Sequence, residues 1–169
     1  RQMGIRDSTG RPQIAISRVF DAPRSLVYRA FTDPDHFVSW WGPTDNVLPR
    51  SEIEFDIRSG GYQRWTEFSS ADPDVRVQVR VDLTDVTDGE LLDGLMAVSG
   101  RLPDGFAPFE TRLRVEFSDE ADGRTRLSIS QWLPRRVTGG AEQGWREALT
   151  KLAAALSATP SSPQSNGVQ

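Results

Sequence analysis

A carboxylate and an imidazole stand three residues apart in this chain, at Asp33 and His36. On a helix this spacing brings both side chains to one face within hydrogen-bonding reach, which is an arrangement suited to general acid–base catalysis. A structural reading competes with that chemistry. Asp33 precedes Pro34 and suits the N-cap of a short helix, and an isolated histidine usually serves packing or solvent contact. We favour the structural reading and assign no catalytic residue.

The residue types that usually hold metals or form covalent intermediates are scarce. The 169 residues include no cysteine, and His36 is the only histidine. Disulfides, thiolate catalysis, sulfur-ligated metals and serine triads that use a second histidine are therefore excluded. We expect no metal, no cofactor and no catalytic residue.

The charge and hydropathy of the chain limit the kinds of partner that we expect. The formal net charge of −4 and the pI near 5.1 argue against a general nucleic-acid binder, which needs a concentrated basic face. No run approaches the roughly 18 apolar residues of a membrane span, and no secretion signal is apparent near the N-terminus. We expect a soluble, cytoplasmic protein without a membrane span.

The elements that position any site begin with a strand and two short helices. Residues 13–20 alternate at Ile14 and Ile16, which predicts a first strand. Apolar residues at helical spacing then predict a helix from Arg24 to Thr32, after Ala22-Pro23. Asp33 and Pro34 predict the start of a second short helix, which we expect to end at Gly42-Pro43.

Residues 46–133 consist of short alternating segments separated by turn residues, among them Asp88-Gly89, Asp104-Gly105 and Asp122-Gly123. This pattern predicts consecutive antiparallel strands. Beyond Leu133-Pro134, apolar residues follow one helical stripe and predict a long last helix; they are Trp145, Leu149, Leu152 and Leu156.

This order of elements predicts an α+β domain at 12–157, with disordered segments at 1–11 and 158–169. The long helix must cover the apolar face of a curved antiparallel sheet. Two short helices and one long helix do not fill a concave sheet completely, so a cavity is expected between the sheet and the last helix.

Four short motifs carry a resemblance to a known family. They are Ala22-Pro23-Arg24, the segment 32–43 with the pair Trp40-Trp41, Gly60-Gly61-Tyr62, and Gly144-Trp145. With them the chain resembles the START-like (SRPBCC) superfamily, in particular homologues of the activator of the heat-shock-protein-90 ATPase. The resemblance covers residues 13–156 and implies a helix-grip fold around an internal cavity.

Several large side chains are candidates for lining that cavity. Neighbours on a helix point about 100° apart, so one ring of the tryptophan pair is expected in the core and the other at the cavity mouth or in solvent. For each candidate, core packing is the alternative. The ligand-binding candidates are Trp40, Trp41, Tyr62, Trp65, Met96, Trp132, Trp145, Leu149 and Leu152.

Four polar residues would orient a ligand if they face inward, namely Arg64, Glu67, Glu110 and Gln131. Their facing depends on strand register, because a slip of one residue reverses every side chain of a strand.

Three functions remain open. The first is non-catalytic binding of a small hydrophobic or amphipathic molecule, such as a lipid, in the cavity. The second, implied by the resemblance, is an enzyme of the polyketide cyclase or dehydratase type, which needs an inward acid or base. The third is regulation of a chaperone ATPase in the stress response, with a chaperone as partner, for which an exposed apolar patch would be the sign. We favour the first. The sequence leaves the oligomeric state open.

Overall fold

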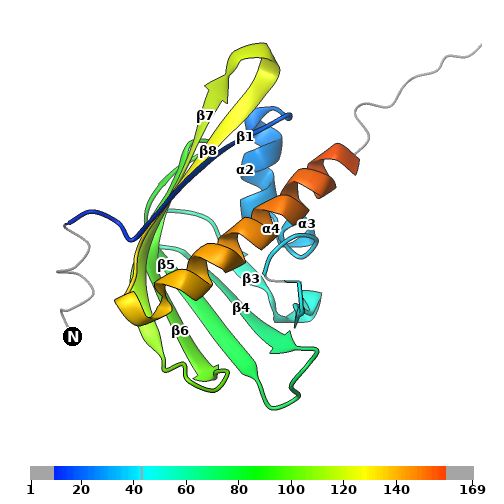
Figure 1. Ribbon diagram of the computed structural model, residues 1–169. Coiled ribbons are helices and arrows are strands. Elements are labelled where there is room, and N and C mark those ends of the chain that lie inside the picture. The colour runs from blue at the N-terminus through cyan, green and yellow to red at the C-terminus, as the bar shows by residue number, and fades with distance from the viewer. Residues whose placement is uncertain (1–9, 43, 159–169) are drawn as a thin grey trace, which may run out of the picture.

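The computed structural model of the protein describes residues 10–42 and 44–158. Its sheet is strongly curved, and one long helix crosses the concave face (Figure 1). The strands are β1 (Ile14–Phe20), β2 (Asn46–Val47), β3 (Glu54–Asp56), β4 (Tyr62–Ser69), β5 (Arg76–Thr87), β6 (Leu91–Arg101), β7 (Phe109–Glu120) and β8 (Arg124–Trp132). The α-helices are α2 (Arg24–Thr32), α3 (Pro34–Phe37) and α4 (Thr138–Ala158), and short 3-10 turns are η1 (Arg50–Glu52), η2 (Ala121–Gly123) and η3 (Arg135–Val137). This is the helix-grip arrangement expected from the sequence.

The eight strands form one antiparallel sheet in the order β1-β8-β7-β6-β5-β4-β2, and β3 also pairs with β4. Strands that follow one another in the chain are neighbours from β4 to β8, because short turns or loops join them. Gly89 in the β5–β6 turn has φ of +77°, a conformation that glycine adopts without steric cost. The Asp88-Gly89, Asp104-Gly105 and Asp122-Gly123 signals therefore mark three of the four connections between these strands.

The second short helix is shorter than expected. It begins at Pro34, with Asp33 as N-cap accepting a hydrogen bond from the amide of Asp35, but it ends at Phe37 rather than Gly42. After Phe37 the backbone forms i→i+3 bonds instead, from the Ser39 amide to the His36 carbonyl and from the Trp40 amide to the Phe37 carbonyl, and the Ser39 hydroxyl donates to the same His36 carbonyl. Trp40 and Trp41 consequently lie in the turn that follows α3 and not on a helix.

Aromatic side chains fill one end of the space between sheet and helices. Phe37 packs edge-on against Trp65, with ring centroids 4.9 Å apart, and Phe31 packs edge-on against Phe117 at 5.4 Å. Leu149 and Leu152 of α4 are buried in the same core. This end of the molecule is thus closed by large rings and by the C-terminal half of α4.

The terminal segments 1–11 and 158–169, expected to be disordered, lie outside the described residues except for Gly10, Arg11 and Ala158. Among the residues that the structure does describe, no helix combines the length and apolar character needed to span a membrane.

Candidate functional site

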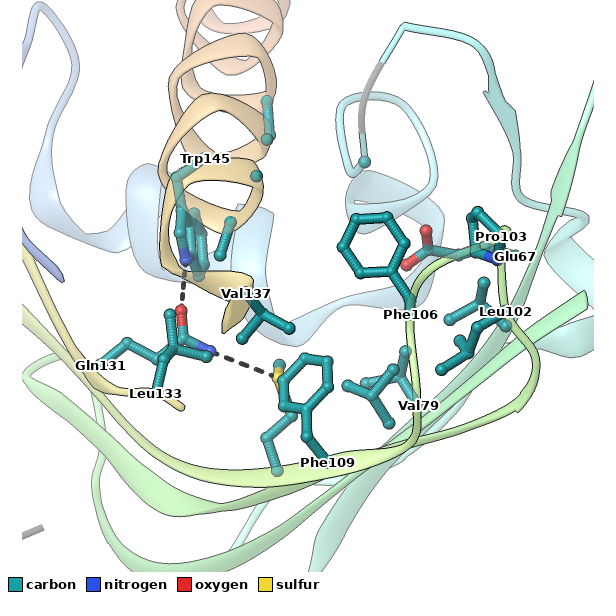
Figure 2. Close-up of a pocket in the computed structure, with 18 of the residues that line it drawn as sticks. Glu67, Val79, Leu102, Pro103, Phe106, Phe109, Gln131, Leu133, Val137 and Trp145 are labelled. Atoms are coloured by element: carbon teal, nitrogen blue, oxygen red, sulfur yellow. Dashed lines mark hydrogen bonds between the residues drawn. The ribbon is translucent and has the colours of Figure 1, made fainter. Parts of the chain in front are cut away.

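A cavity of about 300 Å³ lies between the concave face of the sheet and the first half of α4. Its floor comes from β5, β6, β7 and β8, and one side comes from the loop that joins β6 to β7 (Figure 2). Most of the lining side chains are apolar. Those of the floor are Val77, Val79, Met96, Val98 and Phe109.

The cavity exists because the part of α4 above it carries small side chains. Gly140, Gly144 and Ala148 recur every four residues and all line the cavity, as does Ala141. A side chain at Gly140 would start in open space, since no atom lies within 4 Å of the Cβ position there. Trp145 is the one large side chain of α4 among the described residues that line the cavity, and the large residues Leu149 and Leu152 follow further along the helix, where the core is closed.

Glu67 of β4 brings a buried carboxylate to one end of the cavity. Its Oε2 accepts hydrogen bonds from the indole Nε1 of Trp41 and the indole Nε1 of Trp65, both over 2.8 Å. Its Oε1 accepts a hydrogen bond from Nδ2 of Asn46 over 2.5 Å. This network fixes the carboxylate and joins the turn after α3 to the sheet.

Gln131 of β8 is the second polar side chain in the cavity. Its Oε1 accepts from the indole Nε1 of Trp145 over 2.8 Å, and its Nε2 points at Sδ of Met96, 3.6 Å away. A thioether is a weak acceptor, so one amide N–H of Gln131 has only a weak partner here. Figure 2 places Gln131 beneath Trp145, at the opposite end of the cavity from Glu67.

The β6–β7 loop forms the rim. Phe106 lines the cavity although 46% of its surface is exposed to solvent, which is unusual for a side chain of this size. Arg136 anchors the loop by donating to the carbonyls of Ala107 and Pro108 over 3.4 and 3.2 Å. The rim therefore carries an exposed ring on a loop tied to η3, the turn before α4.

Lys151 lies on α4 close to the Glu67 network. Its ammonium donates to the carbonyl of Trp41 over 3.4 Å. Burial lowers the pKa of Lys151, while the carboxylates of Glu147 and Glu67 oppose that shift. Glu147 in turn accepts from the amide of Thr44 over 3.2 Å, so α4 holds the turn after α3 through two contacts.

Three of the nine ligand-binding candidates named from the sequence line the cavity together, namely Trp41, Met96 and Trp145. The rings of Trp41 and Trp145 are in edge contact, with centroids 5.2 Å apart. Of the four polar candidates, Glu67 and Gln131 face the cavity. Arg64 instead pairs with Glu54 on the other face of the sheet, and Glu110 is exposed.

Four other candidates are buried away from the cavity. Trp40 is enclosed between α2 and α3 and donates from Nε1 to the carbonyl of Ala30 over 2.9 Å. Trp65 borders a separate void of about 20 Å³. Leu149 and Leu152 belong to the closed core. Of the tryptophan pair, Trp40 therefore lies in the core, whereas Trp41 lines the cavity.

The last two candidates, Tyr62 and Trp132, lie on the convex face of the sheet. The hydroxyl of Tyr62 donates to Oε2 of Glu54 over 2.7 Å, and the indole of Trp132 donates to the carbonyl of Gly10 over 2.7 Å. Side chains alternate along a strand, so Gln131 facing inward requires Trp132 to face outward. Trp132 is therefore not the cavity wall that we expected.

Sequence reasoning missed the small residues of α4 and the β6–β7 loop. The signal for the former was present, because glycine and alanine recur every four residues from Gly140 to Ala148. The rim residue Phe106 carried no periodic signal, since it lies in a loop next to Asp104-Gly105.

Asp33 and His36 lie apart from the cavity. His36 Nε2 is 3.9 Å from Oδ2 of Asp33, and the His36 side chain is partly exposed. Neither residue lines the cavity. Within residues 10–42 and 44–158, no cluster of three or more His, Cys, Asp or Glu is arranged to hold a metal ion.

Known structures share this architecture. A crystal structure of a protein from Chromobacterium violaceum is 25% identical, with a TM-score of 0.71 over 85% of this chain and 96% of its own. The AHSA1 protein of Silicibacter pomeroyi is 20% identical, with a TM-score of 0.66 over 85% of this chain and 96% of its own. DynU16, a protein of the dynemicin biosynthetic locus, is 18% identical, with a TM-score of 0.63 over 86% of this chain and 47% of its own.

No curated protein matches the chain. The family model described as "Activator of Hsp90 ATPase homolog 1-like protein" matches residues 21–157, which include the tryptophan pair, the whole cavity floor and nearly all of α4. With its helix-grip fold, the chain therefore belongs to the activator of Hsp90 ATPase homolog 1-like family of the START-like superfamily.

Proposed function

We propose that this protein binds a small apolar or amphipathic molecule in the cavity beneath α4, without converting it chemically. The observation that carries the proposal is the cavity itself. It measures about 300 Å³, and Glu67 and Gln131 supply its only polar side chains apart from the indole N–H groups, among the described residues. This size and composition are typical of pockets for small molecules, which combine apolar walls with a few placed polar groups.

The position of the cavity also supports binding. It is bordered by an exposed loop carrying Phe106, so a ligand has a route past a side chain that is already in contact with solvent. The floor is built on paired strands β5 to β8, which are rigid compared with loops. An apolar ligand would gain about 25 cal/mol for each Å² of apolar surface removed from water.

Titration with N-phenyl-1-naphthylamine, a neutral apolar dye, tests this proposal. Binding in the cavity places the dye against Trp41 and Trp145, so tryptophan emission should fall while dye emission rises and both should saturate together. Native mass spectrometry of protein from its own host, followed by extraction, would identify a natural ligand. Absence of saturable dye binding, together with a mass without ligand, would contradict the proposal.

An enzyme of the polyketide cyclase type is the second candidate function, because Glu67 places a carboxylate inside the cavity. The similarity in fold to DynU16 of a biosynthetic locus is compatible with this function. We rank it second because both oxygens of Glu67 already accept hydrogen bonds from fixed donors of the protein. Recovery of an extracted ligand with unchanged mass and retention time, after incubation with excess protein, would favour binding over turnover.

Chaperone regulation receives less support from the surface. Among the described residues, the exposed large apolar side chains are Val47, Leu95 and Phe106. Val47 lies on β2 and Leu95 on β6, which β4 and β5 separate in the sheet, and Phe106 belongs to the cavity rim. These positions do not form the contiguous patch that a protein partner would require.

A further inference from the structure

The described lining of the cavity holds one acidic side chain and no basic side chain. Glu67 is the only charged residue among the described residues that line it, and the Glu67 residue is 7% exposed. Charged side chains are rarely buried to this degree without an ionic partner. The charge of Glu67 therefore needs an explanation beyond cavity shape.

The hydrogen bonds to Glu67 leave room for one more donor. An ionised carboxylate has about four acceptor sites on its two oxygens. Trp41 and Trp65 occupy Oε2, whereas Oε1 receives only Asn46 Nδ2 from the described residues. All three donors are neutral, so they stabilise the carboxylate through hydrogen bonds but bring no positive charge to it.

Lys151 of α4 interacts with Glu67 electrostatically, but the two side chains are not in direct contact as an ion pair. Lys151 directs its ammonium to the carbonyl of Trp41, 3.4 Å away, and no ion pair formed by the described residues includes Glu67. The cavity side of the carboxylate therefore remains open to a cation from outside.

Aromatic rings next to the carboxylate suit one kind of cation. Trp41 and Phe106 line the same cavity as Glu67, and Figure 2 shows Glu67 at the end of the cavity where Phe106 and Pro103 lie. The faces of aromatic rings attract organic ammonium groups, most strongly where water is excluded. A carboxylate adds a charge-assisted hydrogen bond to the same group.

We propose that the preferred ligand is a cationic amphiphile, an apolar molecule with a protonated amine that donates to Oε1 of Glu67 while its apolar body lies over the floor of β5 to β8. This inference rests on the proposed function, since it names the chemical class of the molecule that the cavity binds. Gln131, at the end of the cavity opposite Glu67, would contact a polar group of the ligand that lies away from the ammonium.

Three probes of nearly equal size test the inference by displacement of N-phenyl-1-naphthylamine at pH 7. They are 4-phenylbutylamine, which is cationic, 4-phenylbutan-1-ol, which is neutral, and 4-phenylbutanoate, which is anionic. We expect the amine to bind at least about tenfold more tightly than the alcohol, and the anion to bind most weakly, because a charge-assisted contact exceeds a neutral one. Equal affinities for amine and alcohol, or a preference for the anion, would overturn the inference.

The variant Glu67→Gln assigns the preference to this residue. Its amide carbonyl can still accept from the two indoles, and Asn46 can turn its own amide to accept from the new NH2 group. We expect the preference for amine over alcohol to disappear while dye binding persists. Glu110→Gln removes the same charge from an exposed position of β7 and should leave the preference intact.

The outcomes separate this inference from the proposed function. If the dye does not bind to the native protein, both fail. If the dye binds but the three probes show no preference for the cation, only the ammonium class is rejected. If Glu67→Gln loses dye binding through misfolding, the ranking of the three probes on the native protein decides alone.

Discussion

The indole of Trp41 donates to Oε2 of Glu67 over 2.8 Å, which fastens the turn after α3 to β4 at one end of the cavity. This contact joins one tryptophan of the pair to the only charged side chain in the cavity lining of the described residues. Together with the buried position of Trp40, it also shows that the two adjacent tryptophans have different structural roles. Trp40 closes the core, and Trp41 borders the space in which a ligand is expected.

Replacing each tryptophan by phenylalanine should separate these two contributions. Trp41→Phe removes one hydrogen-bond donor from a buried carboxylate, which should lower the free energy of unfolding by about 1.5–3 kcal/mol. Because Trp41 lines the cavity, this variant should also lower the affinity for the dye. Trp40→Phe removes the bond to the Ala30 carbonyl and should lower stability by about 1–3 kcal/mol with dye affinity unchanged. Urea unfolding and dye titration check both. A loss of dye affinity in Trp40→Phe equal to that in Trp41→Phe would contradict this division.

The adjacent glycines at the start of α4 provide a matched pair for filling the cavity. At both Gly139 and Gly140 a Cβ would meet no atom within 4 Å, but only Gly140 lines the cavity. Leucine at either position should raise helix stability by up to about 1 kcal/mol. Gly140→Leu should weaken dye binding at least about tenfold, whereas Gly139→Leu should not. Similar dye affinities for the two variants would show that the dye binds elsewhere.

The bond between Gln131 and Trp145 should appear as a coupling energy. Gln131→Leu leaves the buried indole N–H of Trp145 without its acceptor, which should cost about 1–3 kcal/mol of stability. In the Trp145→Phe variant no indole N–H is present, so Gln131→Leu leaves no buried donor without an acceptor and should lower the stability less. A double-mutant cycle by urea unfolding should therefore give an interaction energy of about 0.5–3 kcal/mol. Additive effects would mean that the bond contributes nothing to stability.

Lys151 should give a pH dependence of known sign. Burial lowers its pKa in the folded protein below the ordinary value of 10.5, so the unfolded chain binds more protons between the two values. The lysine contribution to stability should therefore rise with pH across that window and be absent in Lys151→Met. The difference in unfolding free energy between the two proteins isolates this contribution from the tyrosines, which titrate in the same range.

Replacing the carboxylate of Glu147 provides a second test of the Lys151 pKa. Because Glu147 raises the pKa of Lys151, Glu147→Gln should lower that pKa further. Lys151 is the only lysine of the chain, so one NMR signal from isotope-labelled lysine reports the titration. An unchanged or raised pKa in the variant would contradict the assignment.

The fold was predictable because its signals are periodic and local. Alternation at Ile14 and Ile16 and the stripe of Trp145, Leu149 and Leu152 each bury one face of an element, and turn sequences such as Asp88-Gly89 require little tertiary context. The helix-grip order followed from these elements and from the family motifs. The end of α3 was predicted too late because the backbone changes after Phe37 to i→i+3 turn bonds, Ser39 N–H to the His36 carbonyl and Trp40 N–H to the Phe37 carbonyl, which Gly42-Pro43 does not signal.

The site was predictable only in part, because a cavity is defined by where side chains are small. Large residues such as Leu149 and Leu152 were the obvious candidates, yet they fill the core, while Gly140 and Gly144 leave the space open. Strand register decided the remaining assignments. A shift of one residue separates Gln131 inside from Trp132 outside, and composition alone does not determine that choice.

The most direct measurement is the contact between a bound probe and the methyl group of Met96. The chain has two methionines, Met3 and Met96, and Met96 lies on the cavity floor, so methyl labelling gives a simple spectrum. With N-phenyl-1-naphthylamine bound, we predict a shifted Met96 methyl signal and nuclear Overhauser effects between that methyl group and the dye. Saturable dye fluorescence with an unchanged Met96 signal would place the dye outside the cavity and contradict the account.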